Sequence, residues 1–102
     1  MTDTSPKAPK TVHLLILSEL YPSSKYDESQ ELHTSLKAAK SAAQAFLRRH
    51  HRPGATRHGS LRSKRVMVSH PDIVVTATIS TITDPPVIQT LWRYWLERGE
   101  NQ

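Results

Sequence analysis

Residues 66–82 read VMVSHPDIVVTATISTI, and the pattern of this stretch predicts two short strands joined by a turn. Val66 and Val68 alternate along a first short run, and residues 73–82 form a second run rich in β-branched side chains, which favour strands. Between the runs, His70-Pro71-Asp72 has the composition of a turn, so the pattern predicts a β-hairpin. Alternation in the second run assigns one apolar face, made of Ile73, Val75, Ala77 and Ile79, and one polar face, made of Thr76, Thr78 and Ser80.

A further strand is expected upstream, at residues 11–18 (TVHLLILS). Its apolar residues point both ways, which is typical of a central strand covered on both faces. Leu14 and Ile16 face one side, and Leu15 and Leu17 face the other. A turn-rich stretch follows at residues 21–28, and we expect a short edge strand at about residues 30–33.

Two helices complete the predicted fold. Residues 35–50 follow a capping residue at Thr34 or Ser35 and carry an apolar stripe of Leu36, Ala39, Ala43, Phe46 and Leu47. The last helix is expected to begin after Asp84, with Pro85 and Pro86 in its first turn, and to end at Gly99. Its stripe contains Ile88, Leu91, Trp92, Trp95 and Leu96. The order strand, possible strand, helix, two strands, helix predicts an α+β fold, with two helices packed on a small, mainly antiparallel sheet.

The composition indicates one small domain. The 102 residues fit a single unit, which we place at residues 11–99, after a polar tail at residues 1–10 that we expect to be disordered. The sequence has no Cys and no apolar run long enough to span a bilayer, so we expect a cytoplasmic or nuclear protein that does not enter a membrane.

Positive charge is concentrated in residues 48–65, RRHHRPGATRHGSLRSKR, which we call the basic segment. It holds seven of the 14 Lys and Arg and no acid, and without it the net charge falls from +5 to −2. We expect an exposed loop that engages an anionic partner, either an acidic protein surface or a nucleic acid. The chain would then be a non-catalytic binding or adaptor module. The predicted contact residues are Arg48, Arg49, Arg52, Arg57, Arg62, Lys64 and Arg65.

The tyrosines and acids of residues 21–31 support an alternative, a small enzyme or pathway accessory protein that uses this acidic region. Catalytic signals are otherwise weak. Residues 54–60 (GATRHGS) lack the lysine of a phosphate loop, and His50, His51 and His58 lack the spacing of a zinc site. We therefore expect no cofactor and no metal, and the pattern does not favour an enzyme.

The aromatic residues of the last helix allow two interpretations. Trp92, Tyr94 and Trp95 beside Arg93 have the composition of a platform that stacks single-stranded bases. Their helical spacing instead favours Trp92 and Trp95 as core residues, with Arg93 and Tyr94 at the surface.

Three short motifs, VHLLILSE, SKYDESQE and TSLKAAKSAA, lie between Val12 and Phe46. In this order of apolar strand, Tyr- and acid-rich loop and alanine-rich helix, the chain resembles a loose group of small uncharacterised fungal proteins. The resemblance implies a common fold. It implies no activity, partner or functional residue, and the basic segment departs from the pattern of the group.

Overall fold

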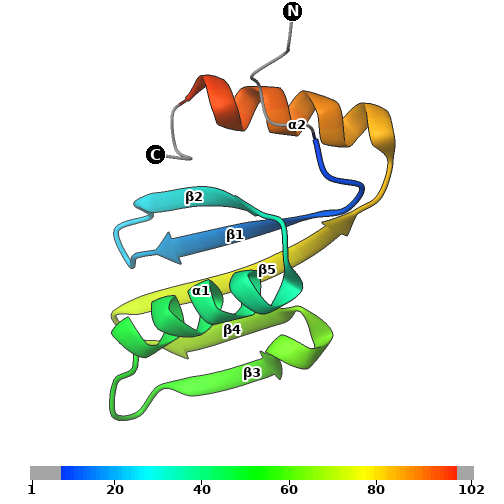
Figure 1. Cartoon of the computed structure of the whole chain (residues 1–102). Helices are drawn as coiled ribbons and strands as arrows, with labels where there is room; N and C mark the ends of the chain where they lie inside the picture. Colours follow the sequence, from blue (N-terminus) through cyan, green and yellow to red (C-terminus); the bar gives the residue numbers. More distant parts are fainter. Residues whose placement is uncertain (1–7, 99–102) are drawn as a thin grey trace, which may run out of the picture.

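The computed structural model describes residues 8–98, which form five strands, two α-helices and one short 3-10 helix (Figure 1). In chain order these are β1 (Val12–Leu20), β2 (Tyr26–His33), α1 (Leu36–Arg49), β3 (Thr56–Ser60), η1 (Leu61–Ser63), β4 (Arg65–His70), β5 (Ile73–Ile82) and α2 (Pro85–Glu97). The α+β fold expected from the sequence is confirmed, with one strand more than expected.

The strands form one antiparallel sheet in the order β2-β1-β5-β4-β3. The predicted hairpin is present, since β4 and β5 pair from His70 and Ile73 outward, and Pro71 and Asp72 make the turn between them. β1 lies inside the sheet, between β2 and β5, as its apolar run predicts. β2 and β3 are the two edge strands among the described residues.

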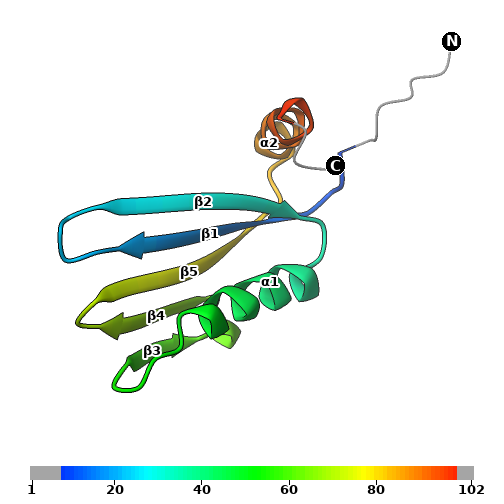
Figure 2. The same ribbon diagram turned by 90° about the vertical axis from the view of Figure 1, so that its left-hand side faces the viewer.

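Helix α1 packs on one face of the sheet (Figure 2). Its hydroxyl cap is Ser35, whose Oγ accepts a hydrogen bond from the backbone N–H of Ala38 at 3.1 Å. The predicted stripe points to the sheet, and Ala39 and Phe46 are 0% and 5% exposed. Opposite it lie the apolar faces of three strands, represented by Leu15 and Leu17 of β1, Val66 and Val68 of β4, and Ile73, Val75, Ala77 and Ile79 of β5.

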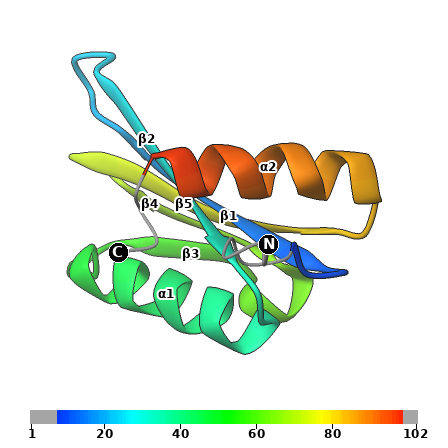
Figure 3. The ribbon, with the colours of Figure 1, turned by 45° about the horizontal axis from the view of Figure 1, so that its top comes forward.

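Helix α2 lies beside the β2 edge of the sheet, well apart from α1 (Figures 1 and 3). It covers a second, smaller cluster in which Val12, Leu32 and Ile88 are buried. Asp84 is the N-cap residue as predicted, but its side chain makes no capping hydrogen bond. The helix ends at Glu97, and the expected stop at Gly99 lies outside the described residues. Neither described helix is long and apolar enough to cross a membrane.

Two expectations change in detail. The second strand is longer than the expected 30–33, because β2 begins at Tyr26. Of the tail expected at residues 1–10, residues 1–7 lie outside the described part of the chain, whereas Ala8 packs against the cluster beneath α2. The boundary at residue 11 therefore excludes a residue that contacts the domain.

Candidate functional site

The basic segment was expected to be a loop, and this expectation is wrong. Residues 48–65 contain the last two residues of α1, a connection at residues 50–55, the whole of β3 and η1, and the first residue of β4. β3 is not predicted by the sequence pattern, because all five residues of TRHGS are exposed and neither face of the strand carries an apolar residue to reveal the two-residue period.

The seven predicted contact residues consequently lie on different elements. Arg48 and Arg49 are in the last turn of α1, where cations interact favourably with the helix dipole. Arg52 lies in the connection, with Nη1 3.7 Å from a carboxylate oxygen of Asp72. Arg57 is on β3, Arg62 in η1, Lys64 between η1 and β4, and Arg65 at the start of β4. All except Lys64 are exposed.

The basic side chains of β3 and of the start of β4 lie on both faces of the sheet. Arg57 is opposite Val68, which packs under α1, so Arg57 lies on the α1 side. His58 is opposite Met67, and Ser60 is opposite Arg65, so His58, Ser60 and Arg65 lie on the other side. Within residues 8–98, β3 pairs with β4 alone, and its outer edge has no neighbouring strand.

The turn after β3 holds this edge in place. Gly59 has a φ of +82°, and a Cβ at this position would clash with the carbonyl oxygen of Arg65. The Ser60 Oγ accepts a hydrogen bond from the N–H of Ser63 at 3.3 Å. The backbone of Lys64 has the left-handed conformation, with a φ of 65°. Its carbonyl oxygen accepts a hydrogen bond from the N–H of Ile79 at 2.8 Å. The strand is therefore fixed by its turn even though its side chains are not buried.

The opposite edge of the sheet is acidic. Residues 26–30 of β2 are exposed, and they include Asp27 and Glu28. Nζ of Lys25 lies 3.8 Å from a carboxylate oxygen of Asp27. The Tyr26 hydroxyl donates a hydrogen bond to a carboxylate oxygen of Glu28 at 3.3 Å. The acidic region predicted at residues 21–31 is thus a turn and most of an edge strand.

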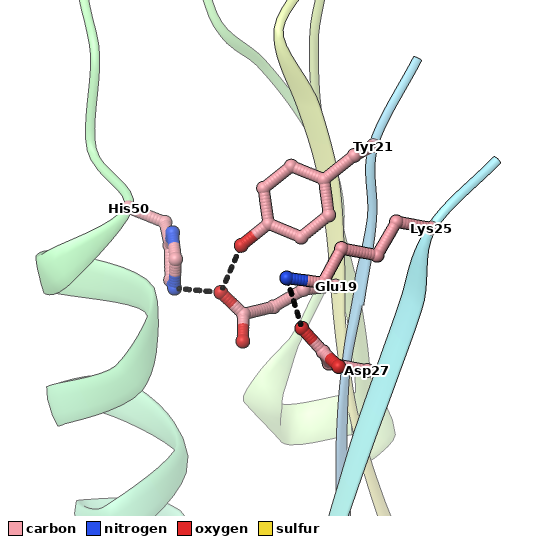
Figure 4. A network of polar contacts seen from close by, with 5 residues as sticks. All are labelled: Glu19, Tyr21, Lys25, Asp27 and His50. Atoms are coloured by element: carbon pink, nitrogen blue, oxygen red, sulfur yellow. Dashed lines mark hydrogen bonds and ion pairs between the residues drawn. The ribbon is translucent and has the colours of Figure 1, made fainter. Parts of the chain in front are cut away.

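A polar cluster joins the end of β1 to the end of α1 (Figure 4). One carboxylate oxygen of Glu19 accepts the Tyr21 hydroxyl at 3.2 Å and lies 3.1 Å from Nε2 of His50. The other nitrogen, Nδ1 of His50, is buried without a hydrogen-bond partner, and the ring lies 4.8 Å from that of Phe46 between centroids. Burial and the neighbouring Glu19 raise the pKa of the Tyr21 hydroxyl.

This cluster bears on the alternative of an enzyme that uses the acidic region. A general base needs an available lone pair within reach of a substrate proton. Nε2 of His50 already contacts Glu19, and Nδ1 is buried, so neither nitrogen is presented to a substrate. The contacts of Glu19 with Tyr21 and His50 connect the end of β1 to the end of α1.

A second polar group lies at the other end of β1, where His13 is 8% exposed. Its Nδ1 lies 3.0 Å from Oγ1 of Thr81, which also accepts a hydrogen bond from Nζ of Lys64 at 3.0 Å. Burial, followed by the positive charges of Lys64 and His33, lowers the pKa of His13. Lys64 is therefore engaged within the fold, and it is the least available of the seven predicted contacts.

The aromatic residues of α2 fall into partly buried and exposed positions, as their helical spacing predicts. Trp92 and Trp95 are partly buried and pack against the cluster beneath α2, while Arg93 and Tyr94 are exposed. The guanidinium of Arg98 lies 5.2 Å from the centre of the Tyr94 ring. Both indoles are thus partly buried packing residues of α2, as the helical spacing favours.

Residues 8–98 contain no group of three or more His, Asp or Glu arranged to hold a metal ion. No protein-family model matches the chain, and no curated protein and no solved structure is significantly similar to it. The inference of a function therefore depends on this chain's own residues, and the most distinctive of these lie on the two edges of the sheet.

Proposed function

We propose that the chain is a non-catalytic binding or adaptor module, and that β3 binds an extended acidic segment of a protein partner as an added strand. The observation that carries this proposal is a fully exposed edge strand, Thr56–Ser60, within a segment that contains seven cations and no acid. Strand addition combines backbone hydrogen bonds, which give affinity, with side-chain contacts, which give specificity.

The backbone of β3 supports this mode of binding. An edge strand exposes a row of N–H and C=O groups that can pair with another chain. β3 has β4 on one side and no strand on the other among residues 8–98. Gly59 and the turn at residues 60–63 hold the strand in place, so little order has to be created when a partner binds.

The charges of this edge favour an acidic partner. Arg57 lies on the α1 side of β3, and His58 and Arg65 lie on the other side. Successive side chains of an added strand also point to alternate faces. A partner with acids at successive positions would therefore meet positive charge on both faces of the sheet.

A peptide partner fits these features better than a nucleic acid does. The cations diverge to opposite faces of the sheet instead of lining one groove, and the basic segment contains no aromatic residue to stack on bases. A phosphate backbone also lacks the alternating amide donors and acceptors that would pair with a strand edge.

The test uses a labelled eight-residue peptide of Glu and Thr that has Glu at successive positions, so that acids point to both faces of the sheet, and its binding is measured by fluorescence anisotropy in low salt. A matched peptide with N-methyl groups on alternate residues keeps the charge but loses the edge hydrogen bonds. We expect the parent peptide to bind and the methylated peptide to bind at least tenfold more weakly. Arg57→Gln should weaken binding, whereas Arg93→Gln, which removes the same charge from α2, should not.

Two results would overturn the proposal. Equal affinity for the parent and methylated peptides would show attraction by charge alone. Tighter binding of duplex DNA than of the peptide, with log affinity falling by roughly 0.9 per phosphate contact for each unit of log salt, would identify a nucleic-acid partner.

A further inference from the structure

A hollow of about 360 Å³ lies over β3 and β4, on the face of the sheet opposite α1. It is lined by His58 and Gly59 of β3, Ser63 of η1, and Arg65 and Met67 of β4. Its volume lies within the range of sites for small organic groups, about 300–1,000 Å³. The hollow is therefore large enough to receive a long side chain of a bound partner.

The polar groups of the hollow favour an anion. Within residues 8–98, no carboxylate lies within ion-pair distance of the Arg65 guanidinium or the His58 ring. The Ser63 hydroxyl already donates a hydrogen bond to the Ser60 carbonyl oxygen at 2.9 Å. The side-chain donors that remain are those of Arg65 and His58. A guanidinium binds phosphate through two parallel N–H donors, so a phosphate group suits this pair.

The floor of the hollow is apolar. Met67 is partly buried and, among the described residues, it packs against neither of the two buried clusters. A methionine sulfur makes favourable contacts with aromatic rings. A small anion bound to Arg65 alone would leave Met67 uncovered, whereas a phosphate carried on a ring would use both the donors and the floor.

The hollow lies within reach of a strand added at β3. Neighbouring strands are about 4.7–4.9 Å apart, so the backbone of β4 lies two spacings, roughly 10 Å, from the backbone of the added strand. A Glu side chain on that strand is short enough to stay over β3. A phosphotyrosine side chain carries its charge beyond a ring, and it extends towards Arg65 and Met67 on β4.

We propose that this hollow binds a phosphotyrosine side chain of the acidic partner segment. The inference rests on the proposed function, because strand addition at β3 brings the side chain to the hollow. The phosphate accepts hydrogen bonds from Arg65 and His58, and the phenyl ring lies against Met67. Acids of the same segment that point to the α1 side face Arg57.

Phosphoserine carries the same charge but fits the hollow less well. Its phosphate is separated from the backbone by a single side-chain carbon, so the charge stays over β3, near His58. The floor at Met67 then gains no contact. The site should therefore distinguish the two phosphorylated residues, and this difference separates a built site from general attraction by the basic segment.

The test compares three labelled peptides based on the Glu-Thr peptide described above. They carry phosphotyrosine, phosphoserine or tyrosine at one central position, and their binding is measured by fluorescence anisotropy in low salt. We expect the phosphotyrosine peptide to bind at least about tenfold more tightly than either of the others, because only its ring and its phosphate both find partners. The phosphoserine peptide has the same charge, so it isolates the contribution of the ring.

Three variants locate the effect. Arg65→Gln should remove most of the gain from phosphotyrosine, and Met67→Ser should bring the phosphotyrosine peptide close to the phosphoserine peptide. Arg62→Gln is the matched control, since it removes the same charge from an exposed position of η1 that does not line the hollow. Circular dichroism of each variant shows that it is folded. In a separate NMR titration, phenyl phosphate should shift the methyl signal of Met67, and inorganic phosphate should shift it less.

Equal affinity for the phosphotyrosine and phosphoserine peptides, or equal effects of Arg65→Gln and Arg62→Gln, would overturn this inference and show attraction by charge alone. If the Glu-Thr peptide binds through its edge hydrogen bonds and phosphotyrosine adds nothing, the proposed function stands and the hollow is not a site. If phosphotyrosine tightens binding and N-methyl groups do not weaken it, the hollow binds phosphotyrosine and strand addition is wrong. If no peptide binds, both proposals fail.

Discussion

Nε2 of His50 lies 3.1 Å from a carboxylate oxygen of Glu19, and this contact ties the C-terminal end of α1 to the end of β1. Glu19→Ala would leave that nitrogen of a mostly buried imidazole without its partner, in addition to the buried Nδ1. We expect the free energy of unfolding to fall by about 1–3 kcal/mol, measured by urea denaturation. Glu97→Ala, at an exposed position of α2, should change it by less than about 0.5 kcal/mol. Equal free energies of unfolding for Glu19→Ala and Glu97→Ala would show that the contact between Glu19 and His50 does not stabilise the fold.

Gly59 and Gly54 have nearly the same φ, +82° and +84°, but different surroundings. A Cβ at Gly54 meets no atom within 4 Å, whereas a Cβ at Gly59 would clash with the Arg65 carbonyl oxygen. Gly54→Ala should therefore cost only the backbone strain, about 1–2 kcal/mol. Gly59→Ala should cost more and should displace β3 from β4, which amide hydrogen exchange of residues 56–60 would detect. A smaller loss for Gly59→Ala than for Gly54→Ala would contradict this account of the turn.

The environment of His13 makes stability depend on pH. Its pKa is lowered from the ordinary value of 6.5 in the folded chain, mainly by burial, so the folded state favours the neutral ring. The unfolded chain binds a proton more readily, and stability is lost as the pH falls below about 6.5 and levels off below the folded pKa. We expect His13→Asn to lose less stability than the wild type between pH 8 and pH 5. His51→Asn, at an exposed position, should follow the wild type.

Core substitutions should show that the packing of α1 contributes more to stability than the packing of α2. Phe46 is 5% exposed between α1 and the sheet, and Phe46→Ala should cost about 3–5 kcal/mol of unfolding free energy through the cavity it leaves. Trp95 is only partly buried beneath α2, so Trp95→Ala should cost less, about 2 kcal/mol, because less apolar area is lost. Thermal or urea unfolding of both variants measures the two losses of unfolding free energy. A larger loss for Trp95→Ala than for Phe46→Ala would contradict this prediction.

Where a face is buried, the sequence predicted the fold well. The β4–β5 hairpin, the inner position of β1 and the apolar stripe of α1 all follow from periodic apolar residues, and all are present. Prediction failed at the edges, where side chains are exposed on both faces. The sequence predicts a loop at β3 and a turn at the first part of β2, because TRHGS and YDESQ contain no alternation of apolar and polar residues. The charge of these segments was visible in the sequence. Their position at the two opposite edges of one sheet was not, since it depends on the order in which five strands pair.

The pairing of β1 with β5 has a consequence for how the chain folds during synthesis. Val12 pairs with Ile82, so β1 and β5 are neighbours in the sheet although β2, α1, β3, η1 and β4 lie between them in the sequence. β1 and β2 can form a hairpin early, but β1 has no second neighbour until β5, at residues 73–82, has left the ribosome. Contacts so distant in sequence form late and slow folding. Until then Leu15 and Leu17 lack β5 as a neighbour, and the nascent chain is most exposed to aggregation at this stage.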